Sequence, residues 1–330
     1  MKILAPLLLV LALILISYVG AGSGGNYLFG AVIPYVALVA FIVGFIAKVI
    51  SWAKSPVPFP IATSGGQAKS MPWIKQAKWD NPSSAWGVAG RMALEVLFFR
   101  SLFRNTKAEL GGNASLTYGT NKWLWMFAMV FHYSFLVVLL RHYRFFLEPV
   151  PAFVKMLEAS DGFFQILAPP LYLTSIGLLA GVCLLLLRRF TAQVRYISLP
   201  ADYFPLFLIL SIATTGILMR YVYRVDIVAV KEVVRGLVAF RPDAEAMSRV
   251  GAIFYMHLFL VCVLLIYFPF SKLMHMGGVF LSPTRNLPGN NREVRHVNPW
   301  NPEVKIRTYA EYEDEFRDKM KNVGLPLEKE

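Results

Sequence analysis

The sequence predicts an all-α membrane protein, a polytopic bundle of about six transmembrane helices. Two observations support this fold class. The 330-residue chain is 56% hydrophobic and only 16% charged, whereas soluble domains average about 25% charged residues. Its hydrophobic residues also gather in runs of roughly 20, the length that crosses a bilayer as a helix with its backbone hydrogen bonds made internally.

The net charge of +13 would favour nucleic-acid binding in a soluble protein. In a membrane protein the excess has a simpler origin, because basic residues flank membrane helices on the cytoplasmic side. We therefore expect the lipid membrane, and no nucleic acid, as a partner.

Six segments are long and apolar enough, or nearly so, to cross the membrane. They comprise residues 3–19, 28–50, 123–140, 163–187, 203–219 and 252–270. The expected organisation is a first helix with a short outer loop (1–26), a second helix (27–51), a cytoplasmic partner-docking loop (52–121), a four-helix core (122–276) and a cytoplasmic tail (277–330). Residues 3–19 also resemble a signal peptide, but no clean A-x-A site follows them, which favours an uncleaved helix.

Lys and Arg residues predict the orientation, because they concentrate in cytoplasmic loops. Residues 52–121 carry eight basic and three acidic side chains, and residues 188–202 carry three and one. The loop 146–162 has one lysine and three acidic residues, so it belongs outside. Both termini are then cytoplasmic, in an inner (cytoplasmic) membrane. Residues 223–249 alternate apolar and charged positions and are expected to form an amphipathic helix on the outer surface.

The long cytoplasmic loop contains one further predicted helix, residues 87–103. Its apolar residues recur at helical spacing, and basic residues are interleaved with them or follow them: Arg91, Arg100, Arg104 and Lys107. Two interpretations are open. The helix rests on the membrane surface, or it forms a docking surface for a cytoplasmic partner, and one helix can do both.

Four of the five histidines lie in two of the apolar stretches. His132 and His142 belong to the third segment, and His257 and His275 to the sixth and the residues just after it. An ionisable ring in hydrocarbon is costly and usually functional, and imidazole is a standard axial ligand of haem iron. Two helices with two histidines each therefore predict two non-covalent haems b. His296, in the polar tail, is expected to lie outside this site.

The predicted topology also pairs the histidines. The third and sixth helices run antiparallel, so His142 pairs with His257 near the outer face and His132 with His275 near the inner face. Ten residues of helix span about 15 Å and eighteen about 27 Å, so the two spacings do not match along straight axes. Pro269 can bend the sixth helix and redirect its end.

Two other classes of function are consistent with parts of the sequence. A haem-free membrane anchor or scaffold would use the long loop to recruit a soluble enzyme, but it leaves the intramembrane histidines only a role in hydrogen bonding between helices. A transporter with a histidine proton relay would need a polar lining, yet the six predicted membrane spans contain no Asp or Glu.

Two stretches resemble the gamma subunit of respiratory nitrate reductase, a five-helix dihaem cytochrome b. They are FYMHLFLVCVLLIYFPFSKLMHM and the histidine spacing of VFHYSFLVVLLRHY, within a resemblance that runs from about Leu28 to Arg285. By position, it implies the same two histidine pairs. The loop segments PFPIATSGGQAKSMPWIKQAK and GRMALEVLFFRSLFRNTK resemble more specifically the membrane cytochrome b family (DsrM) of the sulfite-reduction-associated DsrMKJOP complex.

The DsrM resemblance implies a subunit of a multiprotein complex in sulfate and sulfite respiration. The chain would pass electrons between menaquinol or menaquinone and a cytoplasmic iron–sulfur subunit similar to heterodisulfide reductase. Further partners would be a periplasmic multihaem cytochrome c, a periplasmic iron–sulfur subunit and a second membrane subunit. Gln165 and Arg144, near the outer histidine pair, are candidates for contacts with the quinone.

Overall fold

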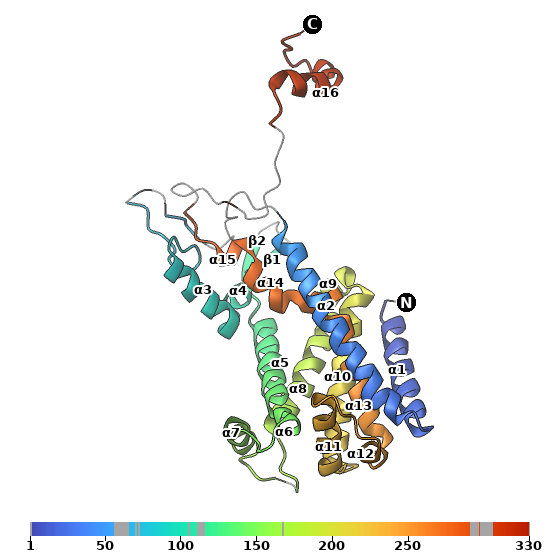
Figure 1. Ribbon diagram of the computed structural model, residues 1–330. Coiled ribbons are helices and arrows are strands. Elements are labelled where there is room, and N and C mark those ends of the chain that lie inside the picture. The colour runs from blue at the N-terminus through green and yellow to red at the C-terminus, as the bar shows by residue number, and fades with distance from the viewer. Residues whose placement is uncertain are drawn as a thin grey trace.

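The computed structural model describes residues 2–55, 66–69, 71, 73–104, 106–110, 116–166, 168–290, 297 and 306–329. His296 lies outside the described residues. The predicted fold class is confirmed: the described chain is a bundle of α-helices, and its one sheet is a two-stranded hairpin (Figure 1).

Five helical segments are long and apolar enough to cross a membrane. They contain α1 (Leu4–Gly22), a π-turn (Leu28–Val32) continued by α2 (Ile33–Ala53), α5 (Lys122–Arg141) continued by α6 (Tyr143–Phe146), α10 (Pro200–Tyr221) and α13 (Ala252–Tyr267) with a 3-10 turn (Phe268–Phe270). These segments match five of the six predicted spans to within a few residues.

The remaining predicted span, residues 163–187, is the fourth along the chain, and it is wrong in its first ten residues. The chain turns irregularly before Tyr172, and helix α8 runs only over Leu173–Arg189. Pro169 and Pro170 explain the difference, because proline lacks an N–H and disfavours helical geometry in the residue before it. With 17 residues, α8 is about 25 Å long, near the lower limit for a membrane span.

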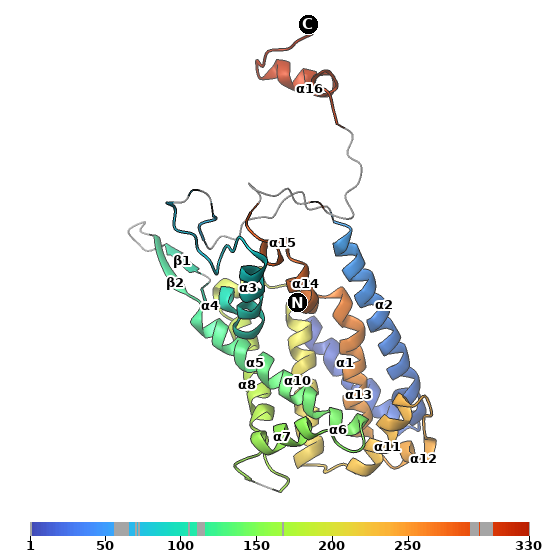
Figure 2. The same ribbon diagram turned by 60° about the vertical axis from the view of Figure 1, so that its left-hand side comes forward.

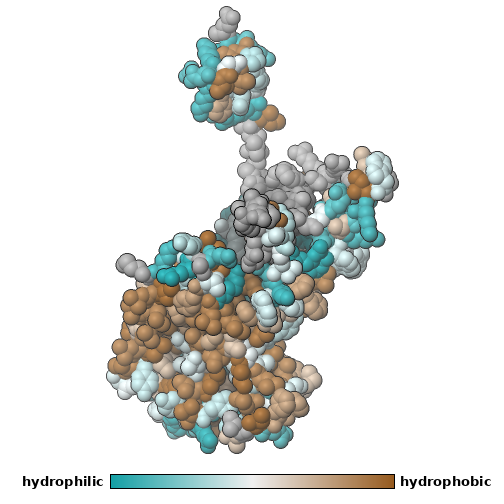
Figure 3. Space-filling model, turned by 180° about the vertical axis from the view of Figure 1, so that it is seen from behind, coloured by the Kyte–Doolittle hydropathy of each residue, from teal (hydrophilic) through white to brown (hydrophobic). Residues whose placement is uncertain are grey.

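The core of the bundle is a row of four helices in which α5 packs on α8, α8 on α10, and α10 on α13. Helix α1 packs on α10 and α13, and α2 packs on α13 (Figures 1 and 2). Helices α5 and α13, which carry His132 and His257, are the outer members of the row and do not pack extensively on each other. The face shown in Figure 3 has an apolar belt with hydrophilic residues toward both ends, as a bilayer requires.

One end of the bundle is covered by short helices: α7 (Ala152–Asp161), α11 (Ile227–Val238) and α12 (Ala244–Ser248). Helix α11 confirms the predicted amphipathic helix. It buries Val230 and Val233 against Phe29 and Tyr255, while the amine of Lys231 pairs with Glu148 on its outer side. We call this the α11 end.

The opposite end, here the α3 end, holds the N-terminal residues of α1 and the described part of the long loop (Figures 1 and 2). The elements here are α3 (Ala85–Phe98), α4 (Arg100–Phe103), β1 (Thr106–Leu110), β2 (Leu116–Thr120), α9 (Ala192–Ile197), α14 (His275–Leu281) and α15 (Pro283–Asn286). The C-terminal tail contains α16 (Tyr309–Asn322). The hairpin of β1 and β2 was not predicted.

The predicted helix 87–103 forms as two helices instead of one. Ser84 caps α3 by accepting a hydrogen bond from the Gly87 amide, which explains why the helix begins there. Phe99 then adopts a left-handed conformation with φ 49°, which ends α3 and redirects the chain into α4. A bulky residue in this region is uncommon, so helical periodicity gave no sign of the break.

Candidate functional site

The structure brings His132 and His275 together at the α3 end. Their ring centroids are 6.0 Å apart and the two rings are nearly perpendicular, with an interplanar angle of 87°. A metal–imidazole bond of about 2 Å, with about 1 Å more from each nitrogen to its ring centroid, places two imidazoles on opposite sides of one metal ion about 6 Å apart. The separation of the two rings therefore fits a pair of axial ligands.

This pair forms because the sixth predicted span does not continue as one helix to His275. Helix α13 ends at Tyr267, two 3-10 turns follow, and His275 is the first residue of α14. Pro269 lies in the first of these turns. The structure thus confirms that the chain is redirected near Pro269, and the redirected segment places His275 beside His132.

The second pair, His142 and His257, lies toward the α11 end. His142 follows the last residue of α5, and His257 lies on α13. The two rings are close enough to interact electrostatically, although α5 and α13 do not pack extensively on each other.

All four histidines use the same ring nitrogen for a hydrogen bond. The Nδ1 atoms of His132, His142 and His275 lie 2.7, 2.7 and 2.9 Å from the carbonyl oxygens of Ala128, Val138 and Lys272. A carbonyl oxygen only accepts, so each Nδ1 carries the proton and Nε2 keeps its lone pair. This is the tautomer that binds a metal through Nε2.

His257 reaches the same state through a side chain. Its Nδ1 lies 2.8 Å from Oγ1 of Thr215 on α10. The Thr215 hydroxyl donates its own proton to the carbonyl oxygens of Ser211 and Ile212, so its oxygen accepts from Nδ1–H. The sequence analysis did not identify Thr215, because a threonine in an apolar helix gives no signal of its own.

Within the part of the chain that the structure describes, no hydrogen bond occupies Nε2 of any of the four histidines. The same residues contain no group of three or more His, Cys, Asp or Glu side chains placed to hold a metal ion. The arrangement therefore supplies two ligands at each of two places, which fits haem, whose porphyrin provides the other four nitrogen atoms, better than a bare ion.

A second layer of contacts holds the His132–His275 pair. The ring of Phe99 meets the ring of His132 edge to face at 5.0 Å. Trp125 Nε1 donates to the carbonyl of Phe98 at 2.7 Å, and Tyr133 Oη donates to that of Leu97 at 2.6 Å. Two α5 residues, one before and one after His132 in the sequence, therefore hydrogen bond to the end of α3 and hold it against α5.

Arg91 fastens α3 to the other histidine of this pair. Its side chain is buried and donates hydrogen bonds to the carbonyl oxygens of Arg285, Leu287 and Asp80. Arg285 belongs to α15, which follows the helix that begins with His275. The two helices α3 and α4 therefore form a clamp, the α3–α4 clamp, between the helix that carries His132 and the segment that follows His275.

The two quinone candidates lie at the α11 end. Gln165 lines an open cleft of about 550 Å³ together with residues of α7 and the turn before α8, including Glu158, Gly162, Pro169 and Tyr172. Arg144 is not free, because its Nη1 atom lies 2.7 Å from Oε1 of Glu158, on the rim of the same cleft. The structure thus places Gln165 in a cleft and Arg144 next to it.

Arg141, which precedes His142, belongs to a buried structural ion pair. Its Nε lies 3.2 Å from Asp161 Oδ2, and both side chains are at most 9% exposed. Its guanidinium also stacks on the ring of Tyr172 at 3.8 Å, and that of Arg220 lies over the same ring at 4.1 Å. Asp161 in turn accepts from the amide and hydroxyl of Thr174 at the start of α8. This network fixes the end of α5, and with it His142.

Comparison with known proteins identifies the family. Residues 83–288 match the family model described as the nitrate reductase gamma subunit. The chain is 46% identical, over 83% of its length and 84% of the relative, to the Hdr-like menaquinol oxidoreductase cytochrome b-like subunit of Archaeoglobus fulgidus. The protein of the same name from Archaeoglobus profundus is 41% identical over 86% of this chain and 85% of the relative.

The nitrate reductase gamma chain of Bacillus subtilis is 26% identical over 61% of this chain and 92% of its own length. The family model spans the described clamp and all four histidines, whereas α1 and α2 precede it. With its apolar helices, the chain is a multi-pass membrane protein that belongs to the nitrate reductase gamma subunit family.

Proposed function

We propose that the chain is a dihaem cytochrome b, the membrane subunit of a quinone-linked electron-transfer complex. His142 and His257 would be the axial ligands of one haem b, and His132 and His275 those of the other. The observation that carries the proposal is the shared tautomer: each Nδ1–H is held by an acceptor, which leaves the Nε2 lone pair of all four histidines available to a metal. The printed names of the Archaeoglobus relatives, menaquinol oxidoreductase cytochrome b-like subunits, support it.

The haem groups would supply one-electron chemistry, and the protein residues would position and insulate them. Ten residues of α5 separate His132 from His142, a rise of about 15 Å. Two haems at these positions would carry electrons along the bundle from one end to the other. The α3–α4 clamp would hold the ligands of one haem, and the Arg141–Asp161 pair and Thr215 those of the other.

The α11 end would be the quinone end. Menaquinol would enter from the membrane into the cleft that Gln165 lines, with Gln165 available to hydrogen bond a quinone oxygen and Arg144 held nearby by Glu158. Oxidation of a quinol releases two protons and two electrons. The electrons would pass to the His142–His257 site, and the protons would leave at this outer end.

The α3 end would be cytoplasmic and would meet the electron-transfer partner, and both termini of the chain would lie on the cytoplasmic side of the inner membrane. A cytoplasmic iron–sulfur subunit similar to heterodisulfide reductase is the proposed partner, in line with the Hdr-like description of the relatives. The finer assignment that we propose is the DsrM family. This assignment would give the complex three further subunits: a periplasmic multihaem cytochrome c, a periplasmic iron–sulfur protein and a second membrane protein. The complex would then act in sulfite respiration.

Haem content tests this proposal directly. The full chain, produced in haem-replete cells and purified in detergent, should contain two haems b in a pyridine haemochrome assay. Each of the four His→Ala variants should contain about one, whereas Gln165→Ala should retain both and reduce them more slowly with a menaquinol analogue. A folded protein without haem would contradict the proposal and favour the membrane scaffold.

A further inference from the structure

An open groove lies at the α3 end, away from all four histidines. It has a volume of about 740 Å³ and is lined by Lys2, Ile3, Leu4 and Leu7 from the start of α1, Arg195 and Tyr196 from α9, and Tyr203 from α10. Helix α1 precedes the part of the chain that matches the nitrate reductase gamma family. The groove is therefore built between an added helix and the family bundle.

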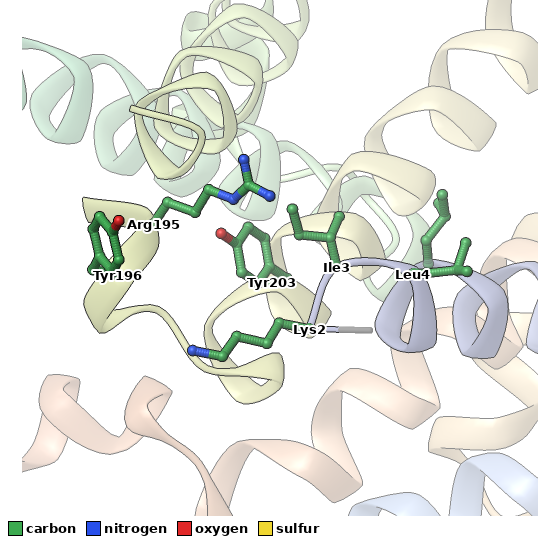
Figure 4. A pocket seen from close by; sticks show the side chains of 7 residues that line it. Lys2, Ile3, Leu4, Arg195, Tyr196 and Tyr203 are labelled. Carbon is green, nitrogen blue, oxygen red and sulfur yellow. The ribbon is translucent and has the colours of Figure 1, made fainter. Parts of the chain in front are cut away.

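Two positive charges from distant parts of the sequence meet in this groove. Figure 4 shows Lys2 and Arg195 extending along opposite sides of Tyr203. Among the residues that the structure describes, no carboxylate pairs with either side chain. The nearby Asp202 is already engaged by Lys272 at 2.7 Å and Arg189 at 3.9 Å. The groove therefore has an uncompensated positive charge and favours an anionic ligand.

Part of the remaining groove lining is apolar and can contact the acyl chain of a lipid. Ile3, Leu4 and Leu7 form the α1 wall, and Leu4 begins a stripe that continues along the helix. Its members, spaced four, three and four residues apart, share one face and are each at least half exposed: Leu4, Leu8, Leu11 and Leu15. The stripe leads from the charged groove toward the middle of the bundle, in the direction that an acyl chain follows.

The aromatic residues place the groove at the membrane surface. Tyr196 on α9 is 82% exposed, and tyrosine side chains gather where lipid headgroups meet the hydrocarbon. Tyr203 is buried, and its hydroxyl donates to the carbonyl of Arg189 at 3.1 Å. It therefore forms a fixed floor between the two cations.

We propose that this groove binds an anionic phospholipid. The headgroup phosphate would lie between the ammonium of Lys2 and the guanidinium of Arg195, and one acyl chain would lie along the leucine stripe of α1. Basic pockets between membrane helices hold anionic headgroups in this way. A bound lipid would join α1 to α9 and α10, so it would stabilise the attachment of the added helix to the family bundle.

Lipid retention measured by native mass spectrometry tests the proposal. The full chain in detergent is titrated with phosphatidylglycerol or phosphatidylcholine at equal concentration. The double variant Lys2→Gln/Arg195→Gln should bind phosphatidylglycerol roughly 25-fold more weakly, because each of the two basic groups near an anionic lipid changes affinity about fivefold. Phosphatidylcholine binding should change little.

Two further variants distinguish this groove from general charge effects. Lys75→Gln/Lys78→Gln removes the same charge from the exposed loop at the same end and should retain the wild-type affinity. Ile3→Trp fills the groove without changing the charge and should also weaken phosphatidylglycerol binding. Equal binding by the wild type and both groove variants would overturn the proposal. Displacement of phosphatidylglycerol by millimolar inorganic phosphate would also overturn it, in favour of a site for free phosphate.

Discussion

Arg91 donates two hydrogen bonds from its guanidinium to the carbonyl oxygen of Arg285, which ties α3 to α15 across almost 200 residues of sequence. The carbonyl oxygens of Asp80 and Leu287 accept from the same side chain. Helix α15 follows the helix that starts with His275, and α3 ends against His132. The contact between Arg91 and Arg285 therefore closes the α3–α4 clamp around the His132–His275 pair.

We expect Arg91→Ala to weaken selectively the binding of the haem proposed at His132 and His275. The substitution leaves several buried carbonyl oxygens without their donor, and each buried unsatisfied group costs about 1–3 kcal/mol. Purified Arg91→Ala should therefore contain between one and two haems per chain. On mild heating it should lose the haem that is still bound at the His132–His275 site. Lys75→Ala, an exposed cation in the same loop, is the control. Full haem content and unchanged thermal release in Arg91→Ala would show that the clamp does not hold the site.

Thr215→Val should raise the midpoint potential of the haem proposed at His142 and His257. Valine has nearly the same shape as threonine but cannot accept from Nδ1–H of His257. The lost hydrogen bond makes the imidazole a weaker base, which destabilises the oxidised iron relative to the reduced iron, and such outer contacts typically change metal affinity about 10–100-fold.

Thr214→Val is the matched control for that potentiometric titration. The Thr214 hydroxyl also donates to a carbonyl four residues earlier, that of Leu210, but among the described residues it shares no hydrogen bond with a histidine. The control should keep both midpoint potentials. If the two variants shifted the same potential equally, the hydrogen bond between Thr215 and His257 would not be the cause.

Asp161→Asn should destabilise the protein far more than Glu158→Gln. Asp161 is 3% exposed where it pairs with Arg141, and removing one partner of a buried ion pair costs about 3–5 kcal/mol. The Glu158–Arg144 pair is more accessible, and exposed pairs contribute about 1 kcal/mol or less. Thermal unfolding in detergent measures both changes. Similar midpoints for the two variants would contradict the assigned role of the Arg141–Asp161 pair.

The attachment of α4 to the preceding loop should weaken in acid. Burial raises the pKa of Asp80, but hydrogen bonds from Arg100 and Arg104 outweigh that effect, so its pKa lies below the ordinary value of 3.8. A carboxyl group with a lowered pKa in the folded state contributes its stabilisation fully above its unfolded pKa and loses it as the pH falls through the folded value.

Hydrogen exchange of the α4 amides, compared between the wild type and Asp80→Asn at each pH, measures this contribution. The wild type should be better protected at pH 6, and the difference should vanish well below pH 4. A difference that persisted unchanged at the lowest pH would exclude ionisation of Asp80 as its cause.

Parts of this molecule were predictable because strong local signals carry them. Runs of apolar residues predicted five spans within a few residues, and alternating charge predicted α11. Pro269 predicted the redirected chain before His275. The topology expected from the basic loops paired His132 with His275 and His142 with His257. In the structure the rings of His132 and His275 lie 6.0 Å apart, and the pairing of the haem ligands stays a prediction.

Other features depend on contacts between distant residues, which a local pattern does not contain. The break of the predicted helix at Phe99 coincides with its contact to His132. The late start of α8 follows from two prolines within an otherwise apolar run. The contact of Thr215 with His257 exists because α10 packs on α13. In the sequence, Arg91 is one of several basic residues on a predicted amphipathic helix, and nothing local distinguishes it from the others.

The pairing of the histidines is tested most directly by double variants and their haem content. His132→Ala/His275→Ala removes both ligands of one proposed site and should leave one haem per chain, as each single variant does. His132→Ala/His257→Ala removes one ligand from each site and should leave none. One haem in the second double variant and none in the first would contradict the pairing on which this account rests.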